Sequence, residues 1–213
     1  MRGPDPGLRT LRLLFTGWMV FWIPVVLWAY GPQNFLWLCN IAKFVALFAL
    51  WTRERFLLSS QAGTVCLVGV IWTLDLLVGV ATGGDGAVIT AYVFDPDLPL
   101  PARLASLYHL FLPALVVRIL LQRGYDRRGP WVQTGIGGAA VVAAWLLAGP
   151  EQNINWAYGP LGLEVLPQPY WAMAAVIIYP LVVYVPGHGL VRGALGVLDR
   201  ESTAGERERS ANP

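Results

Sequence analysis

The chain has 213 residues, with 15 Lys and Arg against 13 Asp and Glu, and a formal net charge of +2. Hydrophobic residues make up 56% of it and charged residues 13%, well below the roughly 25% charged residues of soluble proteins. This composition excludes a water-soluble domain, because a soluble core of this size cannot hold so many apolar side chains. The nearly balanced charge and the lack of nucleic-acid motifs exclude a nucleic-acid partner.

Six apolar stretches follow one another, each close to the roughly 20 residues that a membrane-spanning helix requires. They cover residues 11–30, 34–52, 56–81, 104–122, 131–149 and 170–191. We therefore predict an all-α membrane domain of six transmembrane helices over residues 1–198. The first stretch is longer than the apolar core of a signal peptide, about 7–15 residues. Residues 199–213 mix acidic and basic residues without apolar periodicity and predict a disordered tail.

Arginines gather in the segments on one side of these spans. They are Arg2, Arg9, Arg12, Arg53, Arg55, Arg123, Arg127, Arg128, Arg192, Arg200, Arg207 and Arg209. The loops on the other side carry Arg103 together with Asp85, Asp95, Asp97, Glu151 and Glu164. By the positive-inside rule, this pattern predicts that both termini are cytoplasmic, in a protein of the plasma membrane.

One ionisable residue lies in each of three consecutive spans: Lys43, Asp75 and His109. All three fall in the outer third of the membrane, where a charge costs at least about 2.5–3.5 kcal/mol on insertion scales. We expect them to converge on a polar pocket, with Cys39 and Asn40 on the same helical face as Lys43. Two structural alternatives stay open: a Lys43–Asp75 ion pair that fixes helix register, and a His109 that only packs.

Helical phase also places polar and small residues on one face of the third span. Gln61, Thr64 and Gly79 lie within about 40° of Asp75, so this stripe is expected to face protein rather than lipid. Pro113 follows His109 by one turn in the fourth span. A proline kink there opens space beside the imidazole and favours a pocket.

Two turn-rich loops lie on the outer side, at residues 82–101 and 150–169. The second contains Asn155, Trp156 and Tyr158, which we predict to contact substrate as part of a lid. Aromatic residues of this kind also suit the membrane interface, and that alternative stays open.

Three short segments resemble a known family. Residues 108–116, YHLFLPALV, are similar to the His-x-x-Leu-Pro-x-Val-Leu segment of the androgen-induced and androgen-dependent regulator family. Residues 156–161, WAYGPL, resemble that family's Trp-x-Tyr-Pro stretch, and residues 35–40, FLWLCN, match its nucleophile segment loosely. The resemblance implies six spans with cytoplasmic termini and an intramembrane hydrolase of fatty-acid esters of hydroxy fatty acids. Family members use a threonine on span two and a histidine on span four; a related glycerophospholipid acyltransferase uses cysteine.

The chain departs from that pattern at Trp37, which stands where the threonine is expected and cannot attack a carbonyl. We therefore expect Cys39 as nucleophile and His109 as base in a lipid-directed ester hydrolase or acyl-transfer enzyme. In this scheme Asn40 and Lys43 stabilise the oxyanion, and Asp75 orients Lys43 or His109.

The competing class is a small-solute or proton-coupled transporter, or a ligand-binding membrane protein without catalysis. Transport needs polar residues at both depths of the membrane, and the inner half has few ionisable groups in register with the outer ones. A structural partner in a complex is a third reading. No metal-ligand spacing and no cofactor motif is present, so membrane lipids are the expected partners, one of them as substrate.

Overall fold

The computed structural model describes residues 6–211, with side chains for residues 7–198. Residues 1–5, which include Arg2, and residues 212–213 lie outside the described part. Within it the chain is all-helical, as predicted. In chain order the elements are α1 (Pro6–Tyr30), η1 (Pro32–Leu36), α2 (Leu38–Thr52), α3 (Phe56–Ala81), α4 (Ala91–Phe94), α5 (Leu100–Ala105), α6 (Tyr108–Arg123), α7 (Gly129–Leu147), η2 (Ile154–Trp156), η3 (Pro160–Gly162), α8 (Tyr170–Tyr179), η4 (Pro180–Tyr184) and α9 (Val185–Ala211).

Within residues 6–211, five helical segments are long and apolar enough to cross a membrane. They are Gly7–Tyr30, Phe56–Ala81, Leu100–Arg123, Gly129–Leu147 and Tyr170–Leu198. The segment predicted as the second span, 34–52, differs: residues up to Leu36 form a 3-10 turn, and α2 has only 15 residues. The reason is local, since Gly31 at φ +77 and Pro32 end α1 and start a tight turn before α2 begins.

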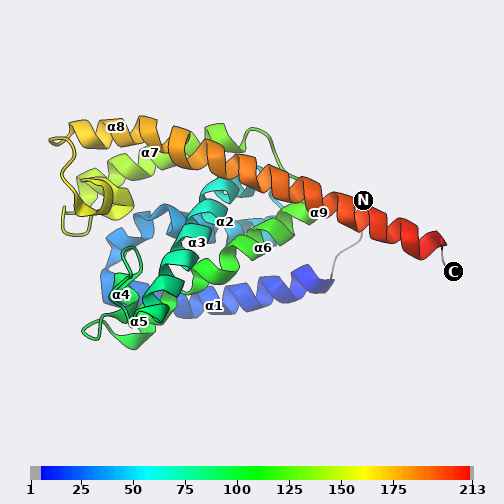
Figure 1. The fold of residues 1–213 in the computed structure, drawn as a ribbon, viewed down its shortest axis with the longest axis horizontal. Helices are drawn as coiled ribbons and strands as arrows, with labels where there is room; N and C mark the ends of the chain where they lie inside the picture. Colours follow the sequence, from blue (N-terminus) through cyan, green and yellow to red (C-terminus); the bar gives the residue numbers. More distant parts are fainter. Residues whose placement is uncertain (1–5, 212–213) are drawn as a thin grey trace.

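Helix α3 occupies the middle of the bundle and packs against α2, α6, α7 and α9 (Figure 1). One apolar cluster lies among α1, α2, α3 and α6, and a second lies between α7 and α8. Close packing at α3 depends on small residues: a side chain at Gly69 would clash with Pro113 of α6, and one at Gly63 would clash with His188 of α9.

The last predicted span is one continuous helix formed by α8, η4 and α9, and its middle part, η4, is π-helical. Pro180 has no N–H to donate, and the chain passes through a π-helical turn, η4, before α9 begins. Helix α9 then runs to Ala211, so residues 199–211, which the composition predicts to be disordered, continue this helix. Ala, Arg and Glu in this segment have high helix propensity, which favours that continuation.

The two ends of the bundle differ in their loops. Residues 82–99 and 148–169, which include α4, η2 and η3, lie at one end, which we call the loop end (Figure 1). Residues 53–55 and 124–128 meet at the other, the basic end, where Arg55 donates to the Arg123 carbonyl at 3.1 Å and the Asp126 N–H donates to Ser59 Oγ at 2.9 Å.

Candidate functional site

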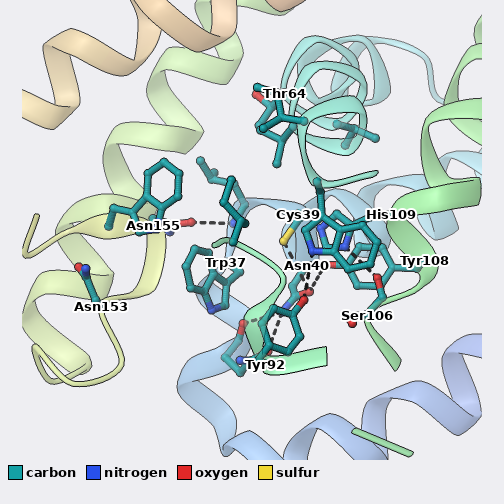
Figure 2. Close-up of a pocket in the computed structure, with 18 of the residues that line it drawn as sticks. Trp37, Cys39, Asn40, Thr64, Tyr92, Ser106, Tyr108, His109, Asn153 and Asn155 are labelled. Carbon is teal, nitrogen blue, oxygen red and sulfur yellow. Dashed lines mark hydrogen bonds between the residues drawn. The ribbon is translucent and has the colours of Figure 1, made fainter. Parts of the chain in front are cut away.

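A cavity of about 830 Å³ lies among α2, α3, α6 and η4, below the two loops of the loop end. Most of its lining is apolar, with side chains such as Val68, Ile71, Leu112 and Val183. The polar side chains of the lining include Asn34 and Tyr184. Others are labelled in Figure 2: Cys39, Asn40, Thr64, Tyr92, Ser106, Tyr108, His109, Asn153 and Asn155. An apolar cleft of this size with a few convergent polar groups is typical of a small-molecule site.

His109 is positioned by the break between α5 and α6. Residues 106–107 form a turn between the two helices, and the Ser106 carbonyl oxygen lies 2.8 Å from His109 Nδ1. A carbonyl only accepts hydrogen bonds, so Nδ1 carries a proton; in the neutral imidazole, Nε2 is then the nitrogen with the lone pair. The imidazole is stacked between Trp72, with ring centroids 4.7 Å apart, and Tyr108, at 4.1 Å. These contacts fix the orientation of the His109 ring.

Cys39 lies in the first turn of α2 and lines the same cavity as His109. Figure 2 shows its sulfur on the side of the cavity where His109, Asn40 and Tyr108 gather. Its polar contact with Asn40 is weak, with Sγ 4.0 Å from Asn40 Oδ1. A thiol in the first turn of a helix that lines the same cavity as an imidazole is a candidate nucleophile.

Asn40 is already fully engaged. Its Nδ2 donates to the Asn34 carbonyl at 2.6 Å and to Asn34 Oδ1 at 2.9 Å, and its Oδ1 accepts from Tyr108 Oη at 3.0 Å. The predicted oxyanion role for Asn40 therefore needs these bonds to break. The geometry favours a positioning role instead: Asn40 ties η1 to α2 and holds the Tyr108 ring against His109.

Lys43 and Asp75 do not meet. The Lys43 ammonium is fully buried, has no hydrogen-bond partner among the described residues, and lies 3.2 Å from the Trp22 ring centroid and 3.3 Å from that of Tyr108. Cation–π contacts of this kind are worth about 2 kcal/mol or more when desolvated. The alternative of a Lys43–Asp75 ion pair is therefore wrong. Helical phase predicts which face of α2 carries Lys43, but it does not predict that this face packs against aromatic side chains such as Trp22 of α1.

Asp75 holds the loop that follows α3. Its carboxylate accepts from the Val88 N–H at 3.1 Å and from the Thr90 N–H and hydroxyl, each at 2.7 Å. Asp75 and Lys43 are both absent from the lining of the cavity within the described side chains. The predicted orienting role of Asp75 toward His109 or Lys43 has no geometric support; the residue folds residues 86–90 back over the helix end.

The three residues predicted in the second outer loop also have backbone partners. Asn155 accepts from the Leu38 N–H at 2.9 Å and donates to the Leu36 carbonyl at 2.8 Å, while the Trp156 carbonyl accepts from Trp171 Nε1 at 2.7 Å. Asn155 and Trp156 line the cavity, so the loop covers it.

Tyr158, the third of them, donates to the carbonyls of Trp145 and Ala148, at 2.7 and 2.9 Å. It is not part of the lining among the described residues. Its hydroxyl instead anchors the loop to the end of α7, so its predicted contact with substrate is not supported by the geometry.

Sequence reasoning missed Tyr92 and Trp72. Tyr92 comes from α4 in the first outer loop, and Figure 2 shows its hydroxyl pointing toward Asn40 and the Cys39 side of the cavity. Trp72 Nε1 donates to this hydroxyl at 3.2 Å, and Ser106 is a second hydrogen-bond partner of it. Burial raises the pKa of Tyr92 to about 12, so it stays protonated at neutral pH. The apolar stretch 87–94 between two turn-rich ends is consistent either with lying on the membrane or with plugging the bundle, and the structure places Tyr92 of this stretch in the cavity lining.

Neither a family model, nor a curated protein, nor a solved structure matches this chain.

Proposed function

We propose that the protein is a six-span intramembrane enzyme that hydrolyses, or transfers the acyl group of, a lipid ester. The apolar helices support an integral membrane protein. Helix α2 rises about 22 Å at 1.5 Å per residue, and the turn of η1 adds roughly another 10 Å, so the two together suffice for a hydrocarbon core of about 30 Å. Arginine in the loops of the basic end supports cytoplasmic termini.

The observation that carries the proposal is the convergence of Cys39, His109 and Tyr92 on one mostly apolar cavity. They come from α2, α6 and α4, three elements that the fold alone brings together. A nucleophile, an oriented base and a hydroxyl donor are the groups that acyl transfer requires.

The chemistry follows from these three side chains. Cys39 Sγ attacks the ester carbonyl carbon, its proton passes to His109 Nε2, and the negative charge that develops on the carbonyl oxygen is stabilised by the Tyr92 O–H. When the tetrahedral intermediate collapses, the C–O bond breaks and the alkoxide takes the proton from His109. Water, or a second alcohol in acyl transfer, then attacks the thioester with His109 again as base and releases the Cys39 thiol.

The substrate class follows from the lining. A volume of about 830 Å³ falls within the range of about 300–1,000 Å³ that small-molecule pockets occupy. Its walls of Val, Leu and Ile accept an acyl chain, while the polar groups fit one ester. The resemblance of residues 108–116 to the histidine segment of fatty-acid-ester hydrolases supports the same substrate class.

The test is labelling of the purified protein in detergent with a long-chain alkyl iodoacetamide, read by mass spectrometry at each cysteine. We expect Cys39 to react faster than Cys66, the second free thiol of the described chain. Since a positioned general base contributes roughly 10²–10⁴-fold, His109→Ala should slow the Cys39 reaction by at least about 10²-fold.

Two controls make the experiment decisive. Cys66→Ala should leave labelling at Cys39 unchanged, and thermal unfolding of each variant reports whether it is folded. Equal labelling of Cys39 in folded wild type and His109→Ala overturns the assignment of His109 as base. No labelling of Cys39 in a folded protein removes the nucleophile and leaves a cavity that binds ligand without chemistry.

A further inference from the structure

A second group of polar side chains lies deeper in the bundle, between the cavity and the basic end. It comprises five side chains from α3, α7, η4 and α9, each at most 4% exposed, which we call the polar file: Gln61, Thr64, Gln133, Tyr184 and His188. The mechanism above uses none of them. Each carries a buried polar atom without a hydrogen-bond partner among the described residues: Gln61 Oε1, Thr64 Oγ1, Gln133 Nε2, Tyr184 Oη and His188 Nε2.

The file is built in helical turns. Gln61 and Thr64 are three residues apart on α3, and Tyr184 and His188 are four apart across η4 and α9, so each pair lies on one helix face. Gln61 Nε2 donates to Gln133 Oε1 at 2.7 Å, which joins α3 to α7.

The next turn of α7 leads on to η4. A side chain at Gly137 would run into Tyr184 Oη, so that hydroxyl lies against α7 one helical turn, about 6 Å of helix rise, from the position of Gln133. Internal water bridges buried polar groups on successive turns of this kind where each molecule has two or more polar partners.

The file has two ends. Thr64 and Tyr184 line the cavity described above. At the other end, Tyr125 Oη lies 2.6 Å from His188 Nδ1, and Tyr125 is half-buried in the loop that joins α6 to α7 at the basic end. The unpaired atoms therefore run from the cavity to the surface of the bundle.

Unpaired buried polar atoms cost about 1–3 kcal/mol each, and five in one row are too many for a folded protein to leave unsatisfied. Internal water satisfies such groups where each molecule has two to four polar partners. We propose that the polar file holds a chain of internal water molecules that connects the cavity with the basic end. This water path goes beyond the proposed function and does not depend on it, although hydrolysis in the cavity consumes water.

Radiolytic hydroxyl-radical footprinting of the full chain in lipid nanodiscs tests this, because radicals made from a bound water modify the side chains next to it. We expect modification of Tyr184 and His188 well above that of Met19, which is equally buried, at 1%, inside an apolar cluster. Methionine is the more reactive side chain, so Met19 is a stringent reference. Modification of Tyr184 and His188 no faster than that of Met19 would show a dry file and overturn the proposal.

Gln133→Leu tests the continuity of the path, because it removes the amide between Gln61 and Tyr184 at nearly the same volume. We expect modification of Tyr184 to fall several-fold, while Gln168→Leu, the same change at an exposed position of the outer loop that does not line the cavity, leaves it unchanged. Thr64→Val supplies a milder second variant if Gln133→Leu does not fold. Unchanged modification of Tyr184 in both folded file variants would contradict a connected water chain.

Discussion

Asn40 and Asn155 at the loop end are nearly as buried as the polar file, while Asp75 is half-buried, and the two groups differ in their partners. Asn40 and Asn155 at the loop end have their amide groups bonded within the protein, and Asp75 accepts from two backbone N–H groups and a hydroxyl. Gln61, Gln133, Thr64, Tyr184 and His188 each keep one polar atom without a partner among the described residues. The polar groups of the loop end stabilise the fold through hydrogen bonds within the protein, whereas the unpaired atoms of the polar file can bind water.

Whether a polar side chain has hydrogen-bond partners distinguishes residues that stabilise the fold from candidate site residues better than their position in the sequence does. Asn155 and Asp75 lie near the cavity and look like site residues, yet each closes a loop. The reactive candidates, Cys39 and His109, both line the cavity: Cys39 Sγ has a weak contact with Asn40 at 4.0 Å, and His109 is bonded to the Ser106 carbonyl through Nδ1.

Asn155→Ala should have the largest effect on stability. It leaves the buried Leu38 N–H and Leu36 carbonyl unpaired, and it puts alanine at φ +52, a left-handed conformation that asparagine tolerates. We expect a loss of about 2–4 kcal/mol in the free energy of unfolding, measured by chemical unfolding in detergent. Gln152→Ala, on the exposed part of the same loop, should change it by less than about 0.5 kcal/mol. Equal effects of the two would mean that Asn155 does not pin the loop.

Asp75→Ala should have the next largest effect. The Val88 and Thr90 N–H groups lose their acceptor, and we expect a loss of about 1–3 kcal/mol and faster proteolysis within residues 82–90. Asp85→Ala, an exposed carboxylate of the same loop, is the matched control and should change neither quantity. If Asp75→Ala abolished labelling of Cys39 while leaving stability intact, the predicted catalytic role would stand after all.

Lys43→Met should change stability by less than about 2 kcal/mol in either direction. Methionine removes the desolvation cost of the buried ammonium but gives up its cation–π contacts with Trp22 and Tyr108, and these two terms are of similar size. Thermal and chemical unfolding measure the balance. A loss above about 3 kcal/mol is what removal of one partner from a buried ion pair costs, and it would reveal an anion beside Lys43.

The smallest effect is expected at Asp126, a half-buried carboxylate paired with the exposed Arg128. Arg128 donates to Asp126 at 2.9–3.0 Å and lowers the pKa of Asp126 to about 2. Because the pKa of the folded state is below the ordinary value of about 3.9, this contribution is present at neutral pH and is lost as the pH falls from about 4 through about 2. Asp126→Asn should therefore be slightly less stable than wild type at pH 7 and equal to it near pH 2. A difference that persists at pH 2 would assign the effect to the backbone turn.

Much of the fold was predictable from apolar run lengths, because a hydrocarbon thickness fixes the length of a spanning helix. Helix α3 has the predicted bounds, and the stripe of Gln61, Thr64 and Gly79 is buried against protein, as predicted. The second span was not predictable in detail: Asn34 lies in a 3-10 turn rather than in α2.

The candidate site was predictable in part. The depth of each residue in its span and its helical phase predicted that Cys39 and His109 line one cavity, because both quantities follow from the regular repeat of a helix. They failed for Lys43 and Asp75, because phase does not say which neighbour faces a residue, and they missed Tyr92, which depends on how an irregular loop folds. The polar file was not predictable for the same reason. The sequence does not show that α7 and α9 pack against α3, which brings Gln133 and His188 to the helix that carries Gln61.

The most direct test of the central claim is the mass of the Cys39 peptide after incubation of the purified protein with a fluorogenic long-chain acyl ester and an acid quench. We expect the mass of one acyl group on Cys39 in wild type and no acyl group in Cys39→Ala. In His109→Ala, the acyl group on Cys39 should form at least about 10²-fold more slowly. Ester consumption at the wild-type rate in Cys39→Ala, or no acyl group on Cys39 in a folded protein, would contradict it.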